Sequence, residues 1–157
     1  MSKSFELANG DLQLGSGRSY NIVSGEQKLL QDLRLWVTEQ VGTDNLIGGT
    51  YGSALDGGVI NGEVQESYIG RTGNFSTLGE IRIIVLNLVQ QYQQMQFTKM
   101  QNEALLYNGA NTLDADEVID SIESVQLAQV GTTVLVQVIL TTLGGSSIKL
   151  TLPLDQG

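Results

Sequence analysis

The residues of this chain that could do chemistry are almost all carboxylates. Its 157 residues include 17 Asp and Glu against 8 Lys and Arg, with no histidine and no cysteine. Without imidazoles and thiols the chain has no Ser-His-Asp triad, no thiolate zinc site and no disulfide framework. Glycoside hydrolysis stays open, because it needs only two carboxyl groups, one of them buried enough to stay protonated.

Two glutamates, Glu26 and Glu39, are the candidates for such a pair. Glu26 lies in the first turn of a predicted helix, where the helix dipole favours its charged form and disfavours the protonated form that an acid catalyst needs. Support of the helix start is a sufficient role for this side chain. We therefore expect no catalytic residues, no cofactor and no metal, and we expect that the chain is not an enzyme.

An acidic run near position 120 could suggest a calcium loop. The run lacks the glycine at the sixth position that an EF-hand loop requires. We predict instead that these carboxylates form a solvated face. Its members are Asp114, Asp116, Glu117, Asp120 and Glu123.

Composition limits the partners and the compartment. The net charge of -9 repels a phosphate backbone, so we expect no nucleic-acid partner. The first residues, MSKSFELANGDLQ, contain no long apolar stretch, and no segment approaches the roughly 20 apolar residues of a membrane helix. We expect a soluble protein made in the cytoplasm, and a length of 157 residues with 41% apolar content predicts one domain over 1–157.

The N-terminal region alternates apolar and polar residues between glycines, which predicts short strands or a β-meander. The apolar positions are Phe5, Leu7, Leu12, Leu14, Tyr20 and Ile22. A helix is predicted next, over residues 25–41. Ser24 to Gln27 form a capping box, and Gly42 can end the helix.

The predicted helix over 25–41 carries one apolar stripe at three- and four-residue steps. Its residues are Leu29, Leu30, Leu33, Trp36, Val37 and Val41. Trp36 falls within this stripe, so we predict that it belongs to the core and does not bind a ligand. A glycine-rich stretch follows, over about 43–74. It predicts an irregular connection with room for one short helix at 53–56, and such a long connection is a candidate contact surface.

A second helix is predicted from a capping box at Thr77 to Glu80, with apolar residues at helical spacing from Ile81 to Met95. Five glutamines between Gln90 and Gln96 make its following face polar and uncharged. Helix propensity can carry it to about Leu106, before Asn108-Gly109 stops it.

The C-terminal region alternates at a two-residue period, from Val134 to Leu140 and again from Ile148 to Leu154. Gly144 to Ser147 lie between the two runs, so the pattern predicts a β-hairpin. Leu135 and Ile139 make the first strand apolar on its second face as well, as expected of a strand covered twice, by a helix and by a neighbouring subunit. The predicted fold is α+β: two main helices on an antiparallel sheet formed by the N-terminal short strands and this hairpin.

The order of these elements resembles the wedge or sheath-initiator proteins of contractile phage tails, tailocins and related injection systems, a family that has at times carried a lysozyme label. The resemblance rests on the segments DLQL, NIVSGEQKLLQDLRLWVTEQVGT and GGTYGSALDGGV, and it spans roughly Leu12 to Leu154. Within the first helix the matching residues are Gly25, Glu26, Leu29, Gln31, Leu33 and Val37. Tyr51-Gly52-Ser53 and Leu55 match the family's following element.

One motif of that family is absent. Many members carry Glu-Pro-Arg after the second helix, where it seats the protein on the wedge core, but the only proline here is Pro153. The corresponding stretch is the glutamine-rich run. We therefore name Tyr51, Gly52, Gln93 and Gln94 as candidate baseplate contacts.

The resemblance implies a structural role in the tail baseplate of a virion assembled in the host cytoplasm. Expected partners are the sheath protein, the baseplate wedge proteins and the tail tube or hub proteins, with several copies in a symmetric, six-fold ring. A sheath protein donates extended arms into neighbouring sheets, so the expected mechanism is addition of a strand to a sheet edge. The candidate edge is Ile148, Lys149, Leu150, Thr151 and Leu152, where Lys149 alone is charged. The alternatives are an assembly chaperone, a binding module and, less favoured, a glycosidase.

Overall fold

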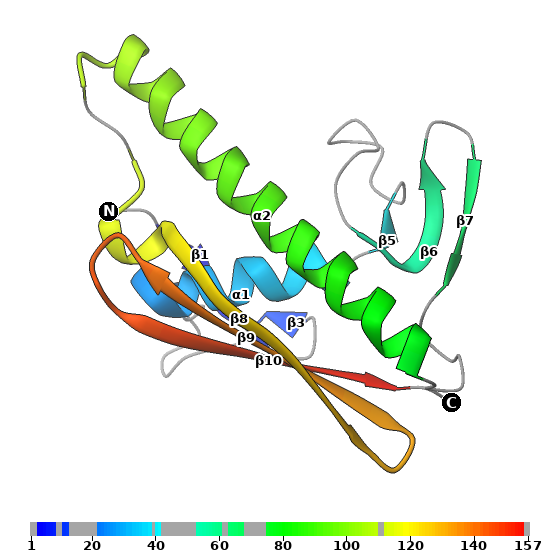
Figure 1. Ribbon diagram of the computed structural model, residues 1–157. Coiled ribbons are helices and arrows are strands. Elements are labelled where there is room, and N and C mark those ends of the chain that lie inside the picture. Colours follow the sequence, from blue (N-terminus) through cyan, green and yellow to red (C-terminus); the bar gives the residue numbers. More distant parts are fainter. Residues whose placement is uncertain are drawn as a thin grey trace.

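A computed structural model describes residues 3–8, 11–12, 22–38, 40–41, 53–60, 63–67, 75–109 and 112–155 of the chain. Its fold is α+β, with two helices on an antiparallel sheet, as the sequence predicts (Figure 1). The helices are α1, Gly25–Thr38, and α2, Phe75–Leu106. The sheet consists of β8, Ile119–Val130, β9, Thr133–Thr142, and β10, Ser147–Asp155.

The three strands lie in the order β10-β9-β8, so β9 is central and antiparallel to both neighbours. The predicted hairpin is confirmed as β9 and β10. Their connecting turn needs glycine twice: Gly145 has a φ of 88°, and a Cβ on Gly144 would lie 2.0 Å from a carboxylate oxygen of Asp116. The turn is anchored to the 3-10 turn η1, Ala115–Glu117, because the amide of Gly144 donates to the carbonyl of Ala115.

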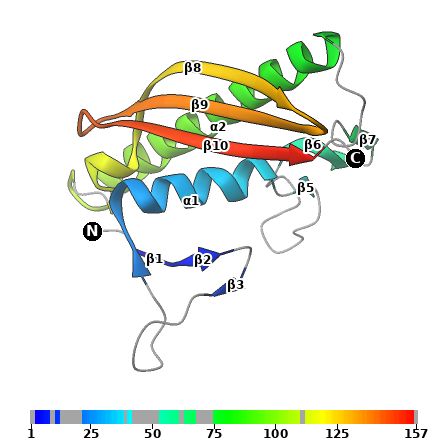
Figure 2. The ribbon, with the colours of Figure 1, turned by 90° about the horizontal axis from the view of Figure 1, so that it is seen from below.

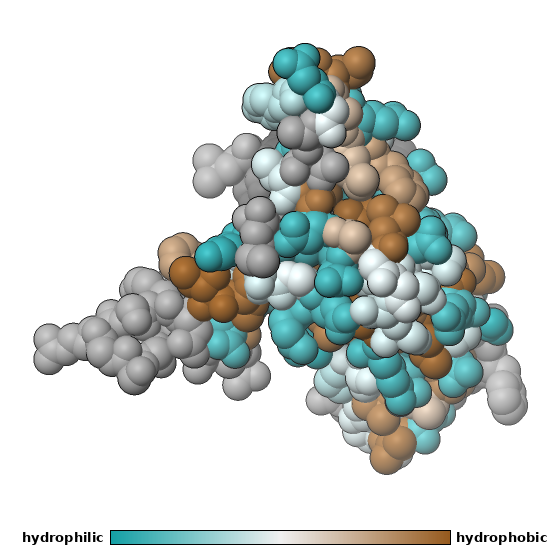
Figure 3. All heavy atoms as spheres, turned by 90° about the vertical axis from the view of Figure 1, so that its left-hand side faces the viewer, coloured by the Kyte–Doolittle hydropathy of each residue, from teal (hydrophilic) through white to brown (hydrophobic). Residues whose placement is uncertain are grey.

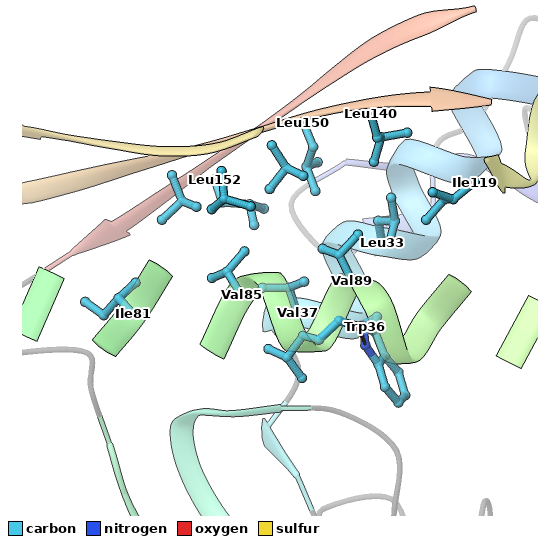
Figure 4. Close-up of a cluster of buried hydrophobic side chains, with 14 of the residues drawn as sticks. Leu33, Trp36, Val37, Ile81, Val85, Val89, Ile119, Leu140, Leu150 and Leu152 are labelled. Carbon is cyan, nitrogen blue, oxygen red and sulfur yellow. Dashed lines mark hydrogen bonds between the residues drawn. The ribbon is translucent and has the colours of Figure 1, made fainter. Parts of the chain in front are cut away.

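Both helices pack on the same face of this sheet. The even-numbered residues of β9 and β10 are buried there, as the strand period of two requires. Figure 2 shows α1 and α2 together on one side of the strands, and Figure 4 shows α2 side chains such as Val85 pointing at Leu150 and Leu152. Trp36 is 5% exposed and donates its ring N–H to the carbonyl of Leu88, which confirms it as a core residue.

The N-terminal strands differ from the prediction in where they pair. β1, Ser4–Phe5, pairs with β4, Ile22–Val23, and β2, Leu7–Ala8, pairs with β3, Asp11–Leu12. Neither pair joins the main sheet. They lie on the outer side of α1, where the Gln31 side chain accepts from the amide of Leu7 and donates to the carbonyl of Phe5. Leu14 and Tyr20 lie outside the described residues.

The first helix is shorter than predicted. It ends at Thr38, and Gln40–Val41 form β5, which pairs in parallel with β6, Ser53–Ile60. Val41 is therefore a strand residue, because pairing with another strand replaces the last helical turn that its spacing had indicated. At the other end of α1 the amide of Gly25 donates to the carboxylate of Glu117, a residue 92 positions away.

The second helix begins at Phe75, two residues before the predicted Thr77, and ends at Leu106 as predicted. Asn108 and Gly109 adopt left-handed backbone angles, with φ of 54° and 89°, and the amide of Gly109 donates to the carbonyl of Ala104. At 1.5 Å per residue the 32 residues of α2 extend about 48 Å. Its last buried residue is Gln96, so the final ten residues project beyond the core (Figure 1).

The glycine-rich connection contains strands where the sequence had predicted irregular structure. β6, Ser53–Ile60, and β7, Glu63–Ser67, form an antiparallel pair, so the predicted short helix at 53–56 is wrong. Ile60 pairs with Glu63, which leaves Asn61-Gly62 between them. This dipeptide, with Val59 and Ile60 before it and Val64 shortly after it, is a strong hairpin signal, and the glycines around it obscured the pattern.

Candidate partner-binding edge

The five residues predicted to contact the sheath lie on β10, at one edge of the sheet. β10 pairs with β9 over nine consecutive residues, from Ser147 opposite Thr141 to Asp155 opposite Thr133, without a bulge. On its other side it pairs with no strand among the described residues. The predicted site is thus a regular strand with one side open.

The side chains of the edge alternate between the core and the opposite face. Ile148, Leu150 and Leu152 are buried against the helices. Lys149 is exposed and Thr151 is half-buried on the other face. The strand is therefore fixed by its apolar side chains, while the backbone edge stays accessible.

The register of β10 with β9 determines which backbone amides of β10 point toward β9 and which point outward. Antiparallel pairs alternate between hydrogen-bonded and non-hydrogen-bonded residues. The amide of Thr142 donates to the carbonyl of Ser146 at 2.9 Å, which makes the next pair a non-hydrogen-bonded one and fixes the alternation. The N–H and C=O groups of Ser147, Lys149 and Thr151 consequently point outward.

The single proline of the chain agrees with this register. Pro153 lies opposite Leu135, at a position whose nitrogen would also point away from β9. Since proline has no N–H, it fits only where the ladder needs no donor. The row of outward donors on β10 is therefore interrupted at Pro153.

The opposite edge strand, β8, is built differently. Its register with β9 shifts twice, and each shift adds one acidic residue, Asp120 and Glu123, as a bulge. Bulges and charges on an edge prevent the addition of another strand. Gln93 of α2 covers the same end, because its side-chain amide donates to the carbonyls of Ile119 and Asp120 at 3.2 and 2.7 Å.

Glu117 corrects the prediction for the acidic run. Asp116, Asp120 and Glu123 are exposed as expected, but Glu117 is only 1% exposed. Its carboxylate accepts from the amides of Gly25 and Asp114 at 3.2 and 3.4 Å. The nearby Asp114 caps η1 in a capping box with Glu117. The predicted solvated face is therefore wrong for this residue, which joins the start of α1 to η1.

A buried glutamine completes this junction. The side chain of Gln96 donates to the carbonyl of Glu117 at 2.6 Å and accepts from the amide of Ile119 at 3.0 Å. It therefore holds the start of β8 to α2. No buried side-chain polar atom of the described residues lacks a hydrogen-bond partner. The sequence gives no signal for this role, because Gln96 is one of several glutamines in the same run.

The second face of the sheet carries two apolar side chains on β9, separated by Gln137. Leu135 and Ile139 are half-buried there, on β9. Their neighbours across the ladders are polar or small: Lys149 and Ser124 beside Ile139, with Ala128 and Pro153 beside Leu135. No described element packs on this face (Figure 2).

The remaining predicted site residues do not come together with β10. Gln94 is exposed on α2, where an open groove runs past Gln90, Gln91 and Trp36. Tyr51, Gly52 and Glu39 lie outside the described residues. Glu26 is half-buried in the first turn of α1.

Metal and membrane sites receive no support from the described part of the chain. It holds no group of three or more acidic or other ligand side chains that could bind a metal. None of its helices combines the length and the apolar character needed to cross a membrane. Comparison of the chain with models of protein families, with curated proteins and with solved structures found no match.

Proposed function

We propose that this chain is a structural component of the baseplate of a phage-type contractile tail, where it links the wedge to the sheath and templates the first sheath ring. The observation that carries the proposal is the open edge of β10. Its outward groups at Ser147, Lys149 and Thr151 meet the needs of an added strand, and the order of elements resembles the sheath-initiator family.

The strength of such a joint comes from the main chain. Each backbone hydrogen bond contributes about 0.5–1.5 kcal/mol net, so a short added strand holds without specific side-chain chemistry. Copies arranged around a six-fold ring bind the first sheath ring together, and avidity multiplies the individual joints. The half-buried side chains of Leu135 and Ile139 give a neighbouring subunit a second surface beside the edge.

The proposed role requires no catalysis. Glu117 is the buried carboxylate of the described residues, and it accepts hydrogen bonds from the backbone amides of Gly25 and Asp114. Glu26 lies in the first turn of α1, where an acidic side chain supports the helix start. These roles of the two carboxylates favour a structural protein over a glycosidase.

Proline substitution at the edge tests the proposal. Thr151→Pro removes an outward donor, so it should leave a folded protein that no longer starts a sheath. Gln129→Pro is the matched control. Val130 pairs with Thr133 across a two-residue turn, so the amide of Gln129 points outward from the opposite edge. The measurement is the fraction of tails that carry sheath when each variant is co-expressed with the tail genes.

The outcomes separate the possible roles. If tails carry sheath with Gln129→Pro but not with Thr151→Pro, the result supports addition of a sheath strand at β10. Full sheath with every folded proline variant at Lys149 and Thr151 contradicts it, and the contact then moves to the glycine-rich stretch. A tagged chain that is absent from finished tails indicates an assembly chaperone instead.

A further inference from the structure

The projecting end of α2 carries an exposed stripe that the proposed function leaves unused. Met95, Thr98, Asn102 and Leu105 follow one another at steps of three, four and three residues, which places them on one face of the helix. Met95 is 43% exposed and Leu105 is 84% exposed. Figure 3 shows apolar side chains at the top of the molecule, where α2 ends.

The surface around this stripe contains a shallow hollow, and hydrogen bonds anchor the helix end that carries it. Met95, Thr98 and Asn102 help to line a shallow hollow along the helix. Glu103 accepts from the backbone amide of Thr112 at 2.8 Å and from its hydroxyl at 2.9 Å. These bonds tie the end of α2 to the returning chain, so the stripe lies on a supported helix.

The surface around the stripe also carries little net charge. Between Ile83 and Asn102 the only charged residue is Lys99, in a chain with a net charge of -9. Copies of such a chain repel one another over most of their surface. They can approach along the end of α2, because the two charged residues beside the stripe, Lys99 and Glu103, form an ion pair at 3.8 Å and offset each other.

We propose that α2 binds the α2 of a second copy of this chain, antiparallel, about a two-fold axis near Met100. A two-fold interface requires a patch that is complementary to itself. The stripe meets this condition, because pairing about residue 100 sets Met95 against Leu105 of the second copy. The same operation sets Thr98 against Asn102 of the second copy, a hydroxyl beside an amide.

The polar pair in the middle fixes the register of the dimer. A buried asparagine in a helix seam is hydrogen-bonded in one register and left unpaired in others, so it specifies the alignment at some cost in affinity. A patch along one helix is smaller than the about 1,000 Å² of a stable interface. The dimer is therefore weak, and it becomes populated as the concentration of the chain rises.

Sedimentation equilibrium of the full chain over a wide concentration range tests this interface. Met95→Glu and Leu105→Glu place two carboxylates in the seam of each dimer, and each should weaken association at least tenfold. Val130→Glu is the matched control, because Val130 is 61% exposed at the end of β8, far from α2 in sequence, and should leave the dimer unchanged. A chain that stays monomeric at every concentration, or a dimer that survives both α2 substitutions, overturns the proposal.

Three further variants fix the register and exclude the β10 edge. The chain has no cysteine, so single cysteines report contacts cleanly. A mixture of Thr98→Cys and Asn102→Cys chains should form a disulfide faster than either variant alone, and equal rates contradict the register. Thr151→Pro should retain the dimer, whereas loss of the dimer in this variant places the contact at β10 and overturns the proposal for α2.

Discussion

The strands β8 and β10 are the two edges of one sheet, but they differ in how open their backbones are to pairing with another strand. β8 is bulged at Asp120 and Glu123, and Gln93 occupies two carbonyls at its start. β10 is regular over its nine pairs and carries Lys149 as its one basic residue. The same hydrophobic core holds both strands, so core packing does not explain the difference.

The difference shows how an edge is kept closed or left open. A bulge breaks the alternation of outward donors and acceptors, and an acidic side chain adds a charge that an incoming strand must desolvate. β10 has no bulge, and its protection is limited to the charges of Lys149 and Asp155 and the missing donor of Pro153. An edge with so little protection is explained if a partner strand covers it in the assembled state.

The largest effect is expected for Leu150→Pro. Leu150 lies one residue from Thr151, but its amide points inward to β9 and its side chain is buried. The substitution removes a ladder hydrogen bond and a core side chain, and it should lower the free energy of unfolding by about 3 kcal/mol or more. Urea unfolding measures the change. A loss as large in Thr151→Pro contradicts the assigned register.

The next effect is expected at the junction that anchors β8. Gln96→Leu leaves the carbonyl of Glu117 and the amide of Ile119 buried and without their partner. The expected loss is about 1–3 kcal/mol in the free energy of unfolding. Gln94→Leu, on the exposed face of the same helix, is the control and should change stability by less than about 0.5 kcal/mol. Equal losses in the two variants contradict the role of Gln96.

Pro153→Thr should lengthen the open edge without changing the core. Threonine restores an outward N–H beside Thr151, at a position whose side chain is exposed. We expect the variant to aggregate at lower concentration than the parent chain, because an unprotected edge pairs with other edges. Light scattering against concentration measures this. Unchanged aggregation contradicts the view that Pro153 limits the edge.

Acid should loosen the end of α2 before it affects the sheet. The backbone amide of Thr112 lowers the pKa of Glu103, its hydroxyl and Lys99 lower it further, and burial opposes the shift. A lowered pKa in the folded state adds stability above the unfolded value, and this contribution is lost as pH falls through the folded value. The amide of Thr112 should then exchange faster with solvent. Glu103→Gln should remove this dependence on pH.

The smallest effect is expected for Glu26→Gln. The substitution removes a charge from the first turn of α1 and should cost only some tenths of a kcal/mol. Neither the parent chain nor the variant should degrade peptidoglycan. Turnover by the parent chain that disappears in the variant contradicts the structural role proposed here.

Most of the main fold follows from periodicity in the sequence. The stripe from Leu29 to Val37 and the two-residue alternation of β9 and β10 both predict the face that is buried. The stop at Asn108-Gly109 is local chemistry, and the helix end was predicted at about Leu106, where it lies. These signals succeed because each depends on near neighbours in the chain.

The features that were not predicted depend on contacts between residues that are far apart in the sequence. In the sequence Glu117 is one of several acidic residues in a run that was predicted to be solvated. In the structure it is buried, and the amide of Gly25 donates to its carboxylate. Val41 has helical spacing but pairs with β6. The candidate edge was predicted as a hairpin strand, whereas the contrast with β8 appears only when the register and the bulges are known.

Amide hydrogen exchange at the two edges tests the central claim most directly. In the free chain the amides of Lys149 and Thr151 should exchange fast, since they point outward from β10. On addition of the sheath protein they should become protected, while the outward amides of Leu127 and Gln129 on β8 stay as they were. Unchanged exchange at Lys149 and Thr151 in a complex that has formed, or protection that appears on β8 instead, contradicts the account.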